Sequence, residues 1–298
     1  MTYSLVARDP ETGDLGVAVQ SHFFSVGSVV AWAEPGVGAV ATQSFVEVSY
    51  GPRGLGLMRN GRSAAGALGE LVDKDEGEAS RQVAMIDAAG RVAVHTGQAC
   101  IAEAGHRVGQ QLSAQANMMR NATVPDAMVT AYSSMTGDLG DRLLAALDAA
   151  EAEGGDVRGR QSAALLVVGG RRSDSPWRER RVELRVEDHP EPLVELRRLM
   201  NLRRAYDELE RAEEIAVSGD IAAAAEHYER AHAAAPDNLE IAFWFGLALA
   251  GSGRVEEGRE HVRRACAVND GWGELLRRLP EAGLIPDNPE LIQALLAD

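Results

Sequence analysis

The first 190 residues alternate between short apolar runs and polar turns, a pattern that predicts β-hairpins. TYSLVA and DLGVAVQS are apolar runs of strand length, and DPETGD between them has the Pro, Gly and Asp of a turn. SVVAWA and VGAVATQSF flank EPG, where Pro35 suits the second turn position and Gly36 the positive φ angle after it. RQVAMID and RVAVHTG, joined by AAG, form a third pair of predicted strands.

Strands and helices alternate over the rest of this region. LSAQANMM, GRQSAALLVVGG and RVELRVEDH are further predicted strands, and LLVV is a continuous apolar run, which is typical of a strand buried on both faces. SAAGALGELVDKD predicts a helix whose first amide groups Ser63 can cap. From Pro125 to Glu153, Ala, Leu and Met recur at helical spacing with a break at Gly137, so we expect two helices there.

From Pro190 onward the pattern becomes wholly helical and repeats itself. GDIAAAAEHYERA, which begins at Gly219, matches GRVEEGREHVRRA, which begins at Gly253, at an offset of 34 residues. This period, with Ala224 and Tyr228 spaced as A-x3-Y, resembles the tetratricopeptide repeat. Two units are fewer than such repeats usually need to stand alone, so we expect them to pack on the first domain or on a second subunit of a homo-oligomer. The predicted domains are therefore residues 1–190 and 191–298.

Composition narrows the classes of function. The chain has 298 residues, 45% of them hydrophobic, and a formal net charge of −15. Such an acidic balance disfavours nucleic acids and anionic membranes as partners, because phosphate binding needs clustered Lys and Arg. Lysine occurs once, as Lys74, which nearly excludes a mechanism that depends on a buried catalytic lysine.

The cysteines and the N-terminus indicate a cytoplasmic protein. Cys100 and Cys266 lie far apart in the sequence, so a disulfide framework is not expected and a reducing compartment fits. Asp9, Glu11 and Asp14 follow the first short apolar run closely, unlike the long apolar segment of a signal peptide. No window reaches the roughly 18 uncharged apolar residues of a membrane span.

Thr2 is the first candidate for chemistry. If Met1 is removed, Thr2 carries both a hydroxyl and a free α-amine, whose unperturbed pKa of about 7.7–8.0 makes it a base near neutral pH. One residue then supplies the nucleophile and the base that activates it. The alternative is that Thr2 is only the first residue of a strand, as in many proteins that begin with Met-Thr.

The sequence around Thr2 resembles a known family. TYSLVARDPETGDLGVAVQSHFFSVGSVVAWAEPGVGAVATQSFVEVSYGPRGL, followed by HTGQACIAEAGHRVG, SAQANMM and GRQSAALLVV, is similar to the 1028 family of domains of unknown function over residues 2–190. That family is grouped with the N-terminal-nucleophile (Ntn) hydrolases. The resemblance implies an α+β fold: a four-layer sandwich of two antiparallel sheets covered by helices on both outer faces, with the nucleophile at the start of the first strand. Thr2 matches that position.

The chain departs from the proteasome-like version of this pattern. An aspartate and a lysine behind the nucleophile are missing, and Gln20 lies where an acid would be sought. Either other residues support the nucleophile, or the chain is a catalytically inactive member.

Three polar residues in apolar surroundings are further candidates. His22 follows the second strand, where a hairpin partner of the first strand would bring it near Thr2; otherwise it is an ordinary surface or hydrogen-bonded histidine. Gln115 and Asn117 alternate along one face of a strand, and an amide donor there can stabilise the oxyanion of a tetrahedral intermediate. The plainer reading of Asn117 is that it satisfies backbone groups at a strand end.

Arg160, Gln161 and Ser162 precede the buried LLVV strand and are candidates for substrate binding. A guanidinium at Arg160 can hold a carboxylate through two hydrogen bonds, or it can form an ion pair with Asp156 or another acid nearby.

A metal site is not expected. His95, Cys100 and His106 are spaced by five and six residues, which fits no standard zinc pattern, and a fourth ligand is not in sight. No cofactor is expected either, since the glycine pairs lack the context of a nucleotide site.

Two functions remain. The first is an amidohydrolase that cleaves the C–N bond of a small or peptide-like amide through Thr2. The second is a non-catalytic binding or scaffold protein that keeps the hydrolase fold and uses its helical repeats for protein–protein contact, as repeats of this kind often do.

Overall fold

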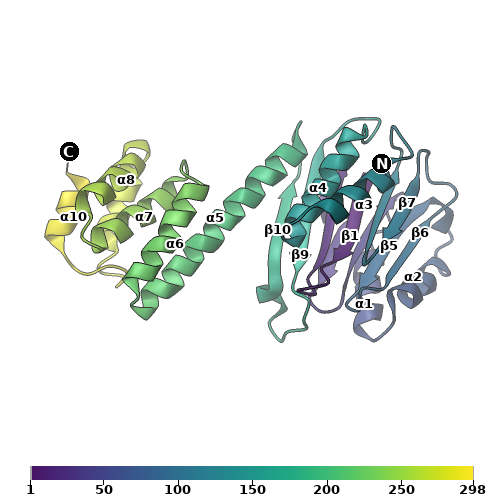
Figure 1. Cartoon of the computed structure of the whole chain (residues 1–298), viewed down its shortest axis with the longest axis horizontal. Helices are drawn as coiled ribbons and strands as arrows, with labels where there is room; N and C mark the ends of the chain where they lie inside the picture. Colours follow the sequence, from purple (N-terminus) through teal and green to yellow (C-terminus); the bar gives the residue numbers. More distant parts are fainter. Residues whose placement is uncertain (1, 298) are drawn as a thin grey trace. The chain divides into compact units, whose positions relative to one another are not determined.

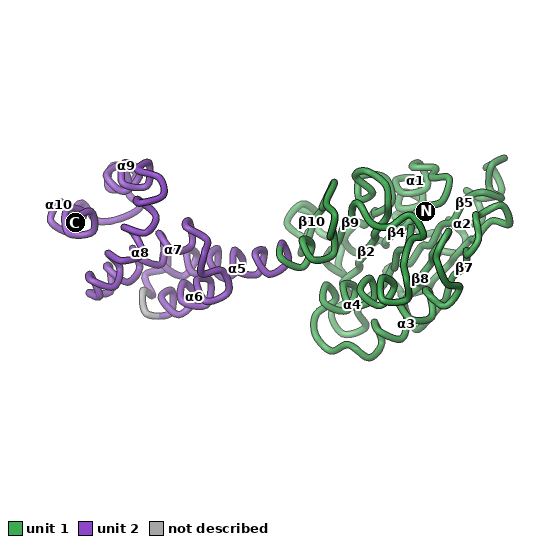
Figure 2. The backbone as a smooth tube through the Cα atoms, turned by 90° about the horizontal axis from the view of Figure 1, so that it is seen from above, with its two compact units in different colours: residues 1–198 green, residues 199–298 purple. Residues whose placement is uncertain are grey.

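The structure, a computed structural model, describes residues 2–297, and the side chains at positions 221 and 222 lie outside the description. The chain divides into two compact units, residues 1–198 and 199–298 (Figure 2). The division falls inside the long helix α5 (Pro192–Ser218). Each unit is described by itself below.

Two antiparallel sheets make up the centre of the first unit (Figure 1). The larger sheet has the strand order β10-β9-β2-β1-β8-β7, with bounds β1 Thr2–Arg8, β2 Leu15–Ser21, β7 Gly105–Gly109, β8 Leu112–Asn117, β9 Ser162–Val168 and β10 Arg180–Val186. The smaller sheet has the order β3-β4-β5-β6, with bounds β3 Ala31–Glu34, β4 Gly38–Ser44, β5 Arg81–Asp87 and β6 Val92–Thr96. The three predicted hairpins β1-β2, β3-β4 and β5-β6 are confirmed by their antiparallel registers.

Helices cover the outer face of each sheet. α1 (Tyr50–Arg59) and α2 (Ala64–Val72) pack on the smaller sheet, whereas α3 (Val124–Ser134) and α4 (Leu139–Ala152) pack on the larger one (Figure 1). Short 3₁₀ turns at Val26–Ser28, Glu78–Ser80 and Pro176–Glu179 complete the unit. The α+β fold with two antiparallel sheets between helical layers is therefore confirmed.

The apolar faces explain why the layers stack. Val6, Val17, Ala39 and Ile86 belong to a fully buried cluster to which strands of both sheets contribute. In LLVV, Leu165, Val167 and Val168 are buried and Leu166 is partly buried, because β9 lies between β2 and β10 and is covered on its faces as well. Sheet faces that are apolar on both sides need a layer on each side, and the helices supply the outer ones.

Local signals account for α2 but not for α1. The Ser63 side chain accepts a hydrogen bond from the Gly66 amide at 3.1 Å, so the predicted N-cap is confirmed. α1 is not predicted by the apolar pattern, since three glycines in ten residues disfavour a helix by propensity. Tertiary packing requires the absence of a side chain, because a Cβ at Gly51 would lie 2.3 Å from the Trp32 ring. The exposed edge strand β7 is likewise not predicted from the pattern.

The second unit is helical throughout its described elements. They are the C-terminal part of α5, then α6 Ile221–Ala234, α7 Leu239–Gly251, α8 Val255–Val268, α9 Gly271–Arg278 and α10 Pro289–Leu296. α6 and α8 begin and end 34 residues apart, which matches the repeat in the sequence. A glycine lies two residues before each of these helices: Gly219 has a φ of +92° and Gly253 a φ of +91°, a conformation that glycine adopts without strain. Among the described helices, none combines the length and apolarity that a membrane span needs.

Candidate functional site

A row of four polar residues crosses the larger sheet where β1 begins. Thr2 pairs with Asn117 on β8, and Ser21 on β2 pairs with Ser162 on β9. The register of Tyr3 with Gln20 brings Ser21 beside Thr2. All four side chains of the row Asn117, Thr2, Ser21 and Ser162 are buried, with Thr2 only 5% exposed.

Hydrogen bonds hold both the side chain and the backbone carbonyl of Thr2. Its hydroxyl donates to the Ser21 hydroxyl oxygen at 3.1 Å. Its carbonyl oxygen accepts from the side-chain amides of Gln43 on β4, at 3.2 Å, and of Asn117, at 3.4 Å. Because one amide comes from each sheet, the start of β1 is fixed to both layers.

A buried amide network supports these two donors. The Gln82 side-chain oxygen on β5 accepts from Gln43 at 2.7 Å and from Asn117 at 2.9 Å. The Gln82 amide in turn donates to the backbone oxygens of Ala116 and Gly105 at 2.9 and 3.1 Å. Gln43 and Gln82 are not singled out from the sequence, although each is a polar residue in a run of buried strand positions, VATQS and RQVAMID. A fully satisfied buried network of this kind holds its members in one arrangement.

Asp156 lies between the extensions of β8 and β2 beyond the start of β1. Asp156 forms an antiparallel bridge with Met119, on the chain that leaves β8. On its other side its carboxylate accepts from the backbone amide of His22, on the chain that leaves β2, at 3.3 Å. Since β1 lies between β8 and β2, the position between their extensions is the one that continues β1 beyond Thr2.

Two residues that directly follow members of this network have strained backbones. Ser44 directly follows Gln43 and has φ +73°, and Met118 directly follows Asn117 and has φ +60°. Positive φ angles cost free energy in residues other than glycine and cluster at functional sites. The positive φ angles of Ser44 and Met118 near Thr2 are therefore typical of a functional site.

Exposed apolar side chains surround the same end of the sheets. Ile101 and Val157 flank Met118 through backbone hydrogen bonds, while the phenylalanines follow the ends of β2 and β4. Their exposed fractions are unusual for large apolar residues: Phe23 50%, Phe24 62%, Phe45 58%, Ile101 44% and Val157 46%.

The comparisons with known proteins agree with this architecture. The model of DUF1028, a family of unknown function, matches residues 2–196. The chain belongs to this family. The crystal structure of protein SPO2555 from Silicibacter pomeroyi, also assigned to DUF1028, is 32% identical, with a TM-score of 0.60 over 67% of this chain and 87% of that chain. A tetratricopeptide-repeat model matches residues 218–279, which confirms the helical repeat. No curated protein matches the chain.

Within the DUF1028 domain, Asn117 and Gln115 have side-chain amides that form buried hydrogen bonds. Asn117 donates to Thr2 and to Gln82, so its amide positions the backbone of Thr2. Gln115 is completely buried; its amide donates to the Ser4 hydroxyl at 2.6 Å and its oxygen accepts from Ser113. Gln115 thus lies one step deeper between the sheets than the row that contains Thr2.

Arg160, Gln161 and Ser162, at the start of β9, have different surroundings. Arg160 forms ion pairs with Glu151, at 3.3 Å, and with Glu191, rather than with Asp156. Gln161 donates to the Asp188 carboxylate at 3.1 Å on the surface. Ser162 accepts from the Val26 amide at 3.0 Å and donates to the carbonyl of Phe23, so it holds the loop after β2.

Gln20 lies on the opposite face of the sheet from Thr2. The Tyr3 hydroxyl contacts the Gln20 side chain and donates to Glu151 on α4 at 2.6 Å. Burial, followed by the nearby Glu151 carboxylate, raises the pKa of Tyr3 well above its usual value. Gln20 therefore contacts residues on the helix-covered face of the DUF1028 domain and does not support Thr2. The buried acid that the strand pairing places at the start of β1 is Asp156.

His22 is anchored beside Asp156 by its backbone. Its Nδ1 atom is enclosed, and no hydrogen-bond partner for it is present among the described residues. An enclosed imidazole nitrogen without a partner is costly unless another molecule supplies one.

His95, Cys100 and His106 have separate partners. His95 contacts the Glu78 carbonyl at 2.8 Å, the Cys100 thiol donates to the Arg81 carbonyl at 3.3 Å, and His106 contacts the Thr96 hydroxyl at 2.9 Å. Over residues 2–297, no three His, Cys, Asp or Glu side chains gather as metal ligands would.

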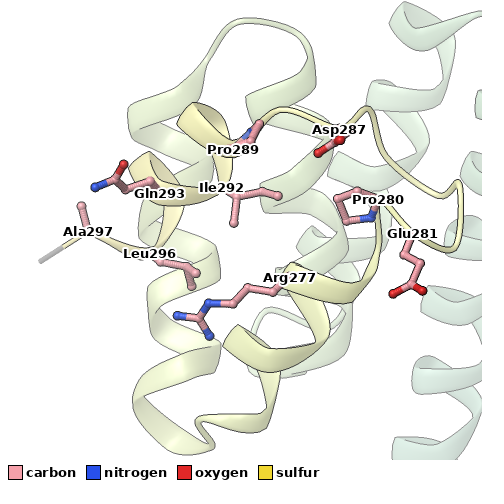
Figure 3. A pocket seen from close by; sticks show the side chains of 9 residues that line it. All are labelled: Arg277, Pro280, Glu281, Asp287, Pro289, Ile292, Gln293, Leu296 and Ala297. Carbon is pink, nitrogen blue, oxygen red and sulfur yellow. The ribbon is translucent and has the colours of Figure 1, made fainter.

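A cavity of about 690 Å³ lies in the second unit between α9 and α10 (Figure 3). Ile292 and Leu296 from α10 face Arg277 from α9 across it, and Glu281 and Asp287 lie on the connecting loop. Its lining contains no hydroxyl or thiol group that would serve as a nucleophile. Thr2 of the DUF1028 domain therefore remains the candidate site.

Proposed function

We propose that this protein is an N-terminal-nucleophile amidohydrolase that cleaves the C–N bond of a small or peptide-like amide through Thr2. The observation that carries the proposal is the immobilisation of Thr2: it starts a central strand, its carbonyl is held by amides from both sheets, and its hydroxyl lies on Ser21. A nucleophile held in this way needs little reorganisation when the substrate binds.

The hydroxyl and the α-amine of Thr2 together supply the nucleophile and the base of the reaction. Removal of Met1, which lies outside the described residues, would expose the α-amine. The amine takes the proton of the Thr2 hydroxyl while Oγ1 attacks the amide carbon, and the resulting tetrahedral intermediate loses the amine half with that proton. Water then attacks the acyl-threonine ester, which releases the acid and restores the hydroxyl.

The α-amine is the base best suited to this site. Lys74 lies exposed on the loop after α2 and pairs with Glu70 at 3.0 Å, so it serves another region of the domain. The hydroxyl of Thr2 has Ser21 as its partner, which keeps Oγ1 directed across the row. We assign Asn117 the positioning of Thr2, and His22, at the end of β2, contact with the substrate.

The surface around Thr2 indicates the character of the substrate. Phe23, Phe45 and Val157 are about half exposed at this end of the sheets (50%, 58% and 46%). Exposed aromatic and branched side chains near a polar centre favour a ligand with an apolar part beside its reactive group. We therefore expect an amide that carries an apolar substituent.

The test is intact mass spectrometry of the purified protein before and after incubation with a hydroxyl-directed acylating probe. We expect loss of Met1 and one adduct, which Thr2→Ala abolishes and Thr2→Ser retains. Both substitutions keep a small residue at position 2, so they keep the condition for methionine removal. Retained Met1, or an adduct that survives in Thr2→Ala, would exclude the proposal.

The helical repeats favour protein contact as a second function, in agreement with the repeat match at residues 218–279. Tyr228, Trp244 and Leu247 line a cavity of about 160 Å³ that Leu284 and Ile285 also border. We propose that this region binds a protein partner or a second copy of the chain, and that the protein, with its two free cysteines, resides in the cytoplasm. Sedimentation of the full chain over a range of concentrations distinguishes self-association from a separate partner.

A further inference from the structure

Asp156 lies at the end of the larger sheet where β1 begins. It continues the line of β1 ahead of Thr2, between Met119 on one side and His22 on the other. The α-amine of Thr2 is the group that leaves β1 in this direction once residue 1 is gone. Asp156 is thus the acid that the pairing scheme places beside that amine.

Asp156 is a buried acid with an arginine partner. Its side chain is completely enclosed (0% exposed), and a buried carboxylate requires compensation. Arg158 provides it: its backbone amide and Nε donate to Oδ1 at 2.9 and 3.2 Å, and a terminal nitrogen donates to Oδ2 at 3.0 Å. The guanidinium is 34% exposed, so this ion pair has a buried negative end and a partly exposed positive end.

We infer that the Asp156–Arg158 ion pair sets the protonation of the Thr2 α-amine and so determines the pH at which Thr2 becomes a nucleophile. The inference rests on the proposed function, because it needs a free α-amine. Asp156 favours the ammonium form and Arg158 favours the neutral base, since a nearby opposite charge stabilises a charged group and a like charge destabilises it. Asp156 and Arg158 are positioning residues: they act on the substrate only through the amine.

Other ionisable groups also lie on the segments around this end of the sheets. Arg81 is occupied by Asp75 at 2.9 Å, and burial lowers the pKa of the His106 imidazole, with His95 contributing. Other ionisable residues at this end of the sheets are His22, Glu47, Cys100, Glu103, Arg120, Arg160, Glu187, Asp188 and His189. Among the described residues, Asp156 is the acid that its bridge with Met119 and its hydrogen bond with His22 place in line with β1.

The experiment measures the pKa of the α-amine directly, without a substrate. The full chain is labelled with an amine-reactive reagent at a series of pH values, and mass spectrometry of the N-terminal peptide gives the rate at Thr2. The chain has one lysine, so Lys74 is an internal reference amine in the same sample. We expect Asp156→Asn to lower the pKa of the α-amine by about one unit and Arg158→Gln to raise it by about one unit.

A matched control lies at the other end of the smaller sheet. Asp87 is 4% exposed over the whole residue, the same fraction as Asp156, and accepts from the Nε of Arg91 at 2.8 Å. In the register of β4 with β5, Asp87 pairs with Gly38, whereas Ser44 at the Thr2 end pairs with Arg81. Arg91→Gln should therefore leave the pKa of the α-amine unchanged.

The outcomes separate the two proposals. Retained Met1 in the wild-type protein removes the proposed function itself. A free Thr2 whose pKa moves in the same direction in both variants, or in neither, overturns the inference and leaves the function standing. If Asp156→Asn does not fold, Arg158→Gln alone decides, because an unshifted or lowered pKa contradicts the inference.

Discussion

Asn117 pairs with Thr2 across β8 and β1, and its side-chain amide also donates to the Thr2 carbonyl oxygen at 3.4 Å. The same amide donates to Gln82 at 2.9 Å, so one side chain ties the start of β1 to the smaller sheet. The strand pairing fixes the position of Thr2 at the start of β1, and the Asn117 amide restrains its backbone.

Replacing Asn117 by Asp should destabilise the first unit. A carboxylate there would face two acceptors, the Thr2 carbonyl and the Gln82 oxygen, and would be buried without a donor. Losing buried hydrogen bonds in this way costs about 1–3 kcal/mol. Thermal unfolding measures the loss, and the rate of acylation at Thr2 should fall with it. Asn121→Asp, at an exposed asparagine, is the control; equal unfolding temperatures for the two variants would contradict the role of Asn117.

Replacing Tyr3 by Phe should cost more than the same change at Tyr206. The Tyr3 hydroxyl is buried against Gln20 and donates to Glu151 at 2.6 Å, so its removal breaks a buried hydrogen bond, although Arg160 still pairs with Glu151. Tyr206 donates to Glu240 at the same distance, 2.6 Å, but water reaches that pair. We expect a loss of about 1–2 kcal/mol for Tyr3→Phe and less for Tyr206→Phe, measured by chemical denaturation. A larger loss at Tyr206 would show that burial does not control the cost.

Replacing Gly258 by Ala should destabilise the repeat region. A Cβ at Gly258 would lie 2.3 Å from the carbonyl oxygen of Gly246, so α7 and α8 would have to separate. Gly251→Ala is the matched control: its Cβ would meet nothing within 4 Å, and alanine suits a helix better than glycine. Calorimetry of the full chain should show a lower transition temperature for Gly258→Ala alone. An unchanged temperature would mean that the two helices can move apart at little cost.

The repeat region should lose stability as the pH falls. Burial, followed by His261 and Arg264, lowers the pKa of His232 below its unfolded value of about 6.5. Between those two pKa values the unfolded chain binds more protons than the folded chain, so the free energy of unfolding rises with pH across this window and is lost as the pH drops through it. Burial also lowers the pKa of His261, whose ring centroid lies 4.7 Å from that of His232.

His232→Phe tests this expectation. Phenylalanine keeps the stacking that His232 makes with Phe245, at 5.2 Å between ring centroids, and removes the titrating group. Unfolding temperatures measured between pH 7.5 and pH 5 should depend less on pH in the variant. Equal slopes for the variant and the wild-type protein would assign the pH dependence to other groups.

The sequence by itself determines the elements whose signals lie in consecutive residues. Alternating apolar positions and turn residues predict the three hairpins, Ser63 predicts the start of α2, and the 34-residue period predicts the equivalence of α6 and α8. Thr2 stands out because its two functional groups belong to one residue. Each of these inferences needs only neighbours along the chain.

Only the tertiary structure decides what surrounds Thr2. The row from Asn117 to Ser162 depends on the registers of four strands, and Gln43 and Gln82 reach Thr2 from the other sheet. Asp156 lies far from Thr2 in the sequence and is placed beside it by pairing with Met119 and His22. The partner of a buried polar group is chosen through space, where register and layer packing set the distances, and no local pattern of residues records that choice.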